Sequence, residues 1–137
     1  MSLKLSHIAI ANPSIKDVFE KLKVLEFEIE TIHEVPTEKV KAAMLPMATS
    51  SELRLEILEP TSTESPISKF LEKKSMGGIH HLCFEVKDLP QWELKLKKSG
   101  AEILPPGIRK AARGKALFIH PKSMGGVLVE LEEIEHS

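Results

Sequence analysis

The chain has a single cysteine, Cys83, one tryptophan and no tyrosine among its 137 residues. One cysteine excludes an intrachain disulfide framework, which fits a reducing compartment. With five phenylalanines as the remaining aromatic residues, stacking platforms for bases or sugars are poorly supplied. Nineteen basic and twenty acidic residues leave almost no net charge, so we expect neither nucleic acid nor an anionic membrane surface as a partner.

Long apolar runs are absent as well, since no stretch approaches the roughly 20 consecutive apolar residues that span a bilayer. The first residues lead directly into a strand-like run, without the apolar core and cleavage site of a signal peptide. We therefore expect a soluble cytoplasmic protein. A chain with 42% apolar residues can bury one sizeable core, which predicts a single domain over residues 1–137.

Two histidines and two glutamates recur at one common spacing. His7 and His81 are 74 residues apart (81 minus 7), and so are Glu56 and Glu130 (130 minus 56). All four lie in strand-like runs, and such fixed-period similarity indicates a duplicated half-domain. Two neutral imidazoles and two carboxylates brought together would make a mixed nitrogen and oxygen site for a divalent cation.

The hydrophobic pattern predicts the same order of elements in each half: a strand, a helix and three further strands. Turn and capping residues place the helices at 15–25, from Ser65-Pro66 onward, and at 88–98. The expected strands cover residues 4–11, 27–35, 40–47, 52–58, 79–86, 102–104, 115–120 and 127–132.

This order of elements favours an α+β fold with two packed halves. The expected repeats cover about 4–60 and 78–133, and a helical linker at about 61–77 joins them. Side by side, two curved sheets would form a cleft lined by strand faces. From their strand positions, we expect the histidines and glutamates to converge in that cleft.

Motifs along nearly the whole chain resemble the vicinal oxygen chelate superfamily, and within it the methylmalonyl-CoA epimerases most of all. Their combination is specific, although each motif alone is weak. They are Leu5-Ser6-His7-Ile8-Ala9-Ile10-Ala11, Leu55-Glu56-Ile57-Leu58-Glu59-Pro60, Ser65-Pro66-Ile67-Ser68-Lys69-Phe70-Leu71-Glu72-Lys73, Gly78-Ile79-His80-His81-Leu82-Cys83-Phe84-Glu85-Val86, His120-Pro121-Lys122-Ser123 and Gly125-Gly126-Val127-Leu128-Val129-Glu130-Leu131.

The resemblance implies two βαβββ modules that form a curved mixed sheet around a metal-bearing cleft. It places the metal ligands at His7, Glu56, His81 and Glu130. The ion would be divalent, with cobalt favoured and zinc, nickel, manganese or magnesium as other choices. The implied activity interconverts (2R)- and (2S)-methylmalonyl-CoA through removal and return of the α-proton, and relatives suggest a homodimer.

The sequence departs from its relatives at a catalytic position. Some relatives carry a glutamate on the third strand as a proposed base, and Ala42 stands at that place here. We therefore expect one or both of Glu56 and Glu130 to move the proton as well as bind the metal. The Gly-Gly pair common in relatives before the seventh strand also reads Arg113-Gly114-Lys115, which alters the expected phosphate or acyl contacts.

The resemblance also directs attention to His120, Lys122 and Ser123 as substrate-binding residues. His120 can contact substrate or anchor its loop, and Lys122 can hold a carboxylate or phosphate or be an ordinary surface lysine. Glyoxalase I uses the same ligand types and remains an alternative enzyme. A metal-free binding protein of the same fold is the alternative from another class, and the complete ligand set argues against it.

Overall fold

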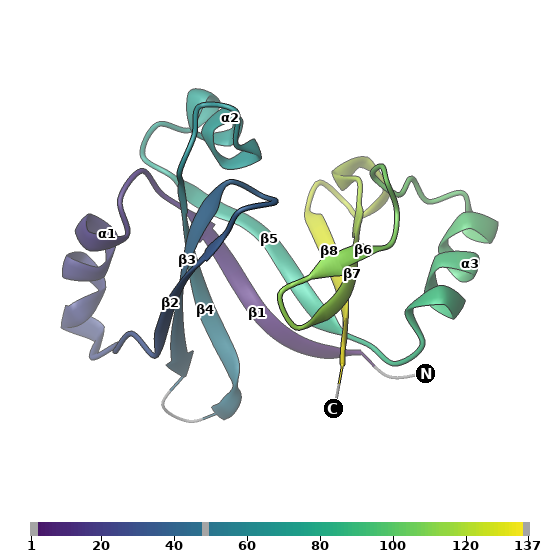
Figure 1. Cartoon of the computed structure of the whole chain (residues 1–137), viewed down its shortest axis with the longest axis horizontal. Coiled ribbons are helices and arrows are strands. Elements are labelled where there is room, and N and C mark those ends of the chain that lie inside the picture. Colours follow the sequence, from purple (N-terminus) through teal and green to yellow (C-terminus); the bar gives the residue numbers. More distant parts are fainter. Residues whose placement is uncertain (1–2, 48–49, 136–137) are drawn as a thin grey trace. The chain divides into compact units, whose positions relative to one another are not determined.

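The computed structural model describes residues 3–47 and 50–135, and it divides them into two compact units (Figure 1). The N-terminal unit is His7–His80. The C-terminal unit combines the start of the chain, through Ser6, with the residues from His81 onward. The boundaries between the units thus fall inside the first strand, β1 (Lys4–Ala11), and the fifth, β5 (Gly78–Glu85).

The N-terminal unit contains a four-stranded mixed sheet in the order β2-β3-β4-β1. β1 pairs in parallel with β4, and the two other pairings are antiparallel. The chain runs from β1 through α1 (Ile15–Leu22), a 3-10 turn (Lys23–Leu25), β2 (Thr31–Val35), β3 (Val40–Met47) and β4 (Ser50–Pro60) to α2 (Pro66–Lys73).

The C-terminal unit repeats this plan with the strand order β5-β8-β7-β6. β5 pairs in parallel with β8, and the remaining pairings are antiparallel. After β5 come α3 (Leu89–Ser99), β6 (Arg109–Ala111), β7 (Gly114–Ile119), a 3-10 turn (Pro121–Ser123) and β8 (Leu128–Ile134). The prediction of an α+β fold built from two βαβββ modules is confirmed.

Individual hydrogen bonds repeat at the same 74-residue offset that links the histidines. The Ile15 amide donates to Glu59 Oε1 at 2.8 Å, and the Leu89 amide donates to Glu133 Oε1 at 2.6 Å. Each glutamate comes from the fourth strand of its module and satisfies an amide at the start of a helix, where backbone N–H groups lack intrahelical partners. The two modules therefore share this helix-capping contact as well as their order of elements.

The sheet of the N-terminal unit has two differently covered faces, since side chains alternate along each strand. The residues facing α1 include Ala43, Leu45, Leu55 and Ile57, which are buried against Ile15. The opposite face packs on α2 through its own apolar cluster of Ala9, Ala11, Val40, Ala42, Leu58 and Ile67. His7 and Glu56 belong to this second face, because Ala9 lies opposite Glu56 in the parallel pairing.

The second strand of each module begins later than the sequence analysis predicts. Residues 27–30 are not strand, and residues 102–104 contribute only an isolated bridge, between Ile103 and Ile119. The two segments are still equivalent, since the Glu30 amide donates to the Met44 carbonyl and the Leu104 amide to that of Phe118, both at 2.8 Å.

The predicted strand at 102–104 is therefore wrong, and β6 lies at Arg109–Ala111. Pro105 and Pro106 follow the bridge and have no N–H to continue the ladder. The turn between β6 and β7 is correspondingly two residues shorter than the turn between β2 and β3, since Ala111 pairs with Gly114 and Val35 with Val40. From β7 onward, equivalent residues of the two modules are again 74 positions apart.

The remaining predicted elements lie within a few residues of the observed ones. α1 ends at Leu22 rather than at residue 25, and β4 extends beyond the predicted 52–58 at both ends. None of the helices in the described ranges is both long and apolar enough to cross a membrane.

Replacing Glu59 or Glu133 by alanine should lower the free energy of unfolding by about 1 kcal/mol, because a helix-initiating amide loses its charged acceptor. Urea denaturation measures the loss, and glutamine at either position should lose less because it keeps an oxygen acceptor. Glu72 is exposed on α2 and provides the control, with an expected change within about 0.5 kcal/mol on Glu72→Ala. Equal effects at all three positions would contradict the capping role.

Candidate metal centre and active site

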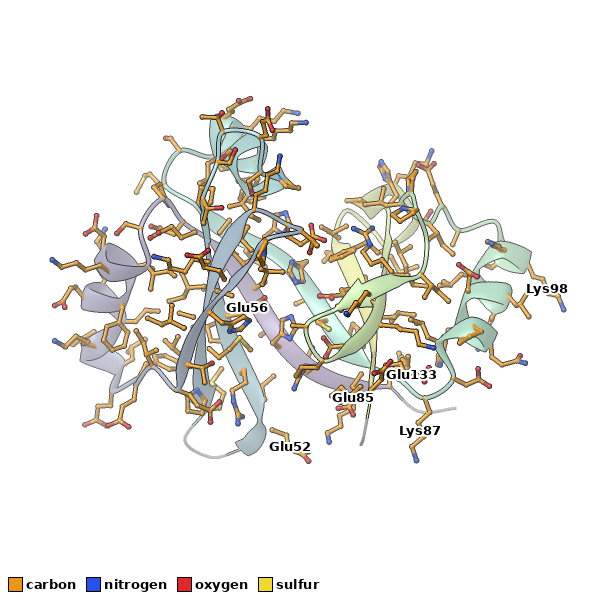
Figure 2. All side chains as sticks on the ribbon, viewed as in Figure 1. Glu52, Glu56, Glu85, Lys87, Lys98 and Glu133 are labelled. Atoms are coloured by element: carbon orange, nitrogen blue, oxygen red, sulfur yellow. The ribbon has the colours of Figure 1, made fainter. Side chains whose placement is uncertain are left out.

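His7 and Glu56 form a buried pair within the N-terminal unit. His7 lies on β1, and Glu56 projects from β4 (Figure 2). The His7 Nε2 and Glu56 Oε1 atoms are 3.4 Å apart, and the two side chains are 6% and 13% exposed. The pair forms because parallel strand pairing brings Glu56 opposite Ala9, two residues after His7 on the same face.

His81 and Glu130 form the equivalent pair within the C-terminal unit. Their Nε2 and Oε1 atoms are 3.1 Å apart, and the side chains are 6% and 11% exposed. Here Glu130 lies opposite Cys83 in the parallel pairing of β5 with β8. The same backbone register therefore produces the same imidazole and carboxylate pair in each unit.

These pairs fit the donor chemistry of a divalent metal ion. A carboxylate and an imidazole buried together are costly unless a charge partner compensates them. Two atoms that bind one ion at about 2.1 Å, at a right or tetrahedral angle, lie roughly 3.0–3.4 Å apart. The observed separations fall in that range, so the histidine and glutamate side chains can serve in metal binding.

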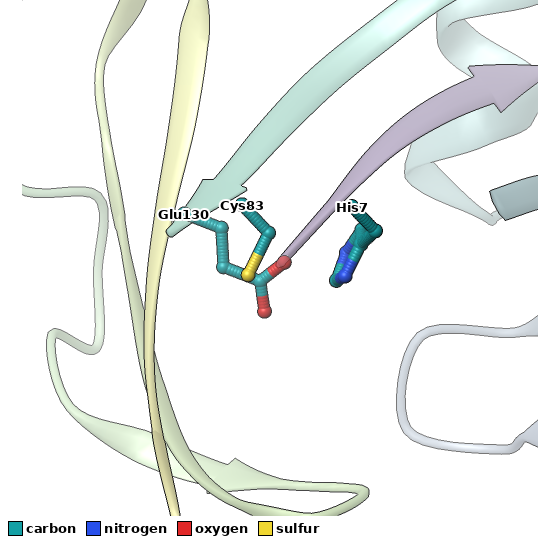
Figure 3. Close-up of side chains that lie close together, drawn as sticks. All are labelled: His7, Cys83 and Glu130. Carbon is teal, nitrogen blue, oxygen red and sulfur yellow. The ribbon is translucent and has the colours of Figure 1, made fainter. Parts of the chain in front are cut away.

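Cys83 lies on β5 and is fully buried. Figure 3 shows the Cys83 and Glu130 side chains on one side of their adjacent strands. Ala9 occupies the equivalent position beside Glu56. A small side chain therefore stands opposite the carboxylate in both modules, which leaves room for the glutamate to lie against the sheet face.

The ring of Phe118 supports the His81 and Glu130 pair, a role that the sequence analysis missed. Phe118 lies opposite Glu130 on β7, and its ring meets that of His81 edge-to-face, with centroids 5.7 Å apart. On the same ring lies the Arg109 guanidinium, 5.0 Å from the centroid. The 74-residue offset could have pointed to Phe118, because its equivalent in the first module, Met44, lies opposite Glu56.

A second carboxylate lies near Glu130 on the same face of β8. Glu132 is 5% exposed, and its Oε1 accepts a 2.6 Å hydrogen bond from Arg113, which also donates to the Ser6 hydroxyl at 3.2 Å. Alternation along β8 could have revealed Glu132, but its equivalent in the first module is the apolar Leu58. The two modules differ here in charge although they share the fold.

Ala42, the third-strand position that the sequence analysis singled out, is fully buried. It lies opposite Leu58, on the face that bears Glu56, and it packs in the cluster beneath α2 with Ile67. The methyl group offers no proton acceptor. Within the N-terminal unit, Glu56 is the carboxylate that β4 places on this face beside a histidine.

His120, Lys122 and Ser123 gather at one loop of the C-terminal unit, where all three contact the loop itself or Glu102. His120 Nδ1 accepts from the Lys122 amide at 3.0 Å, which supports the loop-anchoring role. Ser123 Oγ accepts from the Glu102 amide at 2.9 Å, and the Lys122 ammonium lies 2.5 Å from Glu102 Oε1. The hydrogen bond from Lys122 holds the pKa of the Glu102 carboxyl below its ordinary value.

Comparison with known proteins agrees with this geometry. Residues 6–118 match the family model of the glyoxalase/bleomycin resistance protein/dioxygenase superfamily. The ethylmalonyl-CoA/methylmalonyl-CoA epimerase of Cereibacter sphaeroides is 37% identical, over 96% of this chain and 98% of that protein. The mitochondrial methylmalonyl-CoA epimerase of Dictyostelium discoideum is 38% identical, over 95% of this chain and 78% of that protein.

A structural match also leads to a methylmalonyl-CoA epimerase. A variant of the Streptomyces coelicolor methylmalonyl-CoA epimerase in complex with 2-nitronate-propionyl-CoA matches with a TM-score of 0.86 and 28% identity. The match covers 98% of this chain and all of that one. The chain therefore belongs to the glyoxalase/bleomycin resistance protein/dioxygenase superfamily, among its methylmalonyl-CoA epimerase relatives.

Proposed function

We propose that the chain is a metal-dependent epimerase that interconverts (2R)- and (2S)-methylmalonyl-CoA. The observation that carries the proposal is the repetition of one buried imidazole and carboxylate pair in two equivalent modules. A reaction that runs in both stereochemical senses needs a proton acceptor on one side of a carbon and a proton donor on the other. The names of the relatives favour this activity over that of glyoxalase I and over metal-free binding.

In this proposal His7, Glu56, His81 and Glu130 together hold one divalent ion. The ion would supply positive charge for the oxygen of the thioester carbonyl, where negative charge develops when the α-proton leaves. Cobalt is the favoured metal, and zinc, nickel, manganese and magnesium also suit the same nitrogen and oxygen donors. The two modules would form a single domain over residues 1–137, with repeats at about 4–60 and 78–133.

The glutamates would also move the proton. One carboxylate takes the proton from the carbon between the thioester and the free carboxylate of the substrate, and the bonding electrons shift to the thioester oxygen. The other glutamate, which starts the step as the carboxylic acid, gives its proton to the opposite side of that carbon, and the two glutamates exchange roles in the reverse reaction. Ala42 contributes no acceptor, and Glu132 is engaged by Arg113, so Glu56 and Glu130 are the proposed proton carriers.

The substrate is an acyl-CoA, and we propose that its polar groups contact the loop of His120, Lys122 and Ser123. The side chain of Lys122 is 66% exposed beside Glu102, so its ammonium can exchange that partner for a carboxylate or phosphate. A homodimer and a cytoplasmic location remain predictions from the sequence.

The chain should catalyse deuterium exchange into the α-carbon of methylmalonyl-CoA in heavy water. Chelation should abolish the exchange and cobalt should restore it, because enolisation without the cation leaves the developing charge unsupported. Proton magnetic resonance of the α-position follows the reaction, and metal analysis of the purified protein gives the bound ion. Turnover of a glutathione hemithioacetal, without any exchange by the metal-loaded chain, would overturn the epimerase in favour of a glyoxalase.

Glu56→Gln and Glu130→Gln should each reduce epimerisation by about 10²- to 10⁴-fold, the usual contribution of a positioned acid or base. Each variant should still exchange the α-proton of one epimer without inverting it, and the two variants should prefer opposite epimers. Glutamine keeps an oxygen ligand, so metal content should be measured alongside. The control is Glu72→Gln on α2, and full activity of both site variants with metal bound would exclude the glutamates as proton carriers.

A further inference from the structure

The hairpin formed by β6 and β7 carries a group of cationic side chains around an open hollow in the surface of the C-terminal unit. Four of the residues that line the hollow are cationic, against two glutamates. The cations are Arg109, Lys110, Arg113 and Lys115, and the glutamates are Glu133 and Glu135. The hollow therefore has a surplus of positive charge, although the whole chain is nearly neutral.

Two of these cations face each other directly. Lys110 and Lys115 are partners in the antiparallel pairing of β6 with β7, and both are exposed. Like charges directly opposite one another destabilise a strand pair. Neither lysine forms an ion pair with any residue in the described ranges. Within the β6 and β7 pair, this arrangement therefore costs stability rather than adding it.

The first module provides an internal comparison for the same two positions. Glu34 and Lys41 are the equivalent partners in the pairing of β2 with β3, so opposite charges face each other there. The fourth strand contributes a glutamate beside each pair, Glu59 next to Lys41 and Glu133 next to Lys115. The duplicated hairpins thus share one layout and differ in the sign of a single charge.

The other charged groups of the hollow are partly committed to internal contacts. Glu133 Oε1 accepts from the Leu89 amide at the start of α3, and the Arg113 guanidinium bonds to Glu132 at 2.6 Å. Arg109 lies on the Phe118 ring, on the face of the sheet that bears Glu130. Lys110 and Lys115 remain as the cations most available to an external anion.

We propose that this hairpin binds the phosphate groups of coenzyme A, an assignment that rests on the proposed acyl-CoA substrate. Lys115 is three residues along β7 from Phe118, which lies opposite Glu130, a distance of roughly 10 Å at the usual strand rise. An extended pantetheine arm is longer than that. β6 is the outermost strand of its unit, so the arm can pass around this edge from the Glu130 face to both lysines.

The decisive variant is Lys110→Glu, which gives the second hairpin the charge pair of the first. It should raise the KM for methylmalonyl-CoA about tenfold or more, the loss expected for one charge-assisted hydrogen bond. The KM for methylmalonyl-pantetheine, which lacks the nucleotide phosphates, should not change. Lys115→Gln should act in the same direction. Thermal denaturation should show no loss of stability for Lys110→Glu, because the substitution removes a repulsion.

Two control variants match this change in charge. Lys98→Glu reverses one charge on the exposed face of α3 in the same unit (Figure 2), and Glu34→Lys creates the doubly cationic pair in the first hairpin. Both should leave the KM for either thioester unchanged. If Lys110→Glu raised the KM for both thioesters equally, or if Lys98→Glu matched its effect on the CoA substrate, the phosphate site would be wrong.

Calorimetric titration with coenzyme A itself separates this inference from the proposed function. The wild-type chain should bind coenzyme A about tenfold more tightly than Lys110→Glu does, and the difference should shrink at high salt. If the wild-type chain exchanges the α-proton of neither thioester, the epimerase proposal fails and this comparison still decides the phosphate site. Equal affinities of the two proteins for coenzyme A would overturn the phosphate site whatever the activity.

Discussion

The parallel pairing of the first and fourth strands is the constraint on which both halves of the candidate site depend. It places a glutamate opposite a small residue, Ala9 or Cys83, two positions after a histidine on the same face. The imidazole and the carboxylate then meet without any contribution from a loop. A parallel pair needs a long crossover, and in each module the helix and two further strands provide it.

The same pairing fixes how the modules are anchored to their helices. Three residues after the candidate ligand, Glu56 or Glu130, the fourth strand carries a second glutamate that points to the other face of the sheet. This second glutamate accepts a hydrogen bond from the backbone amide of the first residue of the helix. One strand therefore carries the candidate ligand on one face and the helix cap on the other. This arrangement explains why Glu59 and Glu133 keep the same spacing as Glu56 and Glu130.

Much of the fold and of the candidate site could be predicted from the sequence alone, because every strand that carries a candidate ligand keeps the 74-residue spacing between the modules. β6 was missed, since two prolines and a shorter turn shift it without changing the apolar pattern on either side. Phe118 and the bond between Glu132 and Arg113 were missed for another reason. They arise from cross-strand neighbours, which become visible only when the register is known.

The shift of β6 by two residues has a consequence for how such a duplicated chain can change. Two residues are one full period of a strand, so the shift returns every side chain to its original face, whereas a single-residue change would have turned the strand over. Arg109 therefore faces the same way as its counterpart His33, and Lys110 the same way as Glu34. The two-residue difference in turn length therefore leaves the side-chain pattern on both faces of this edge intact.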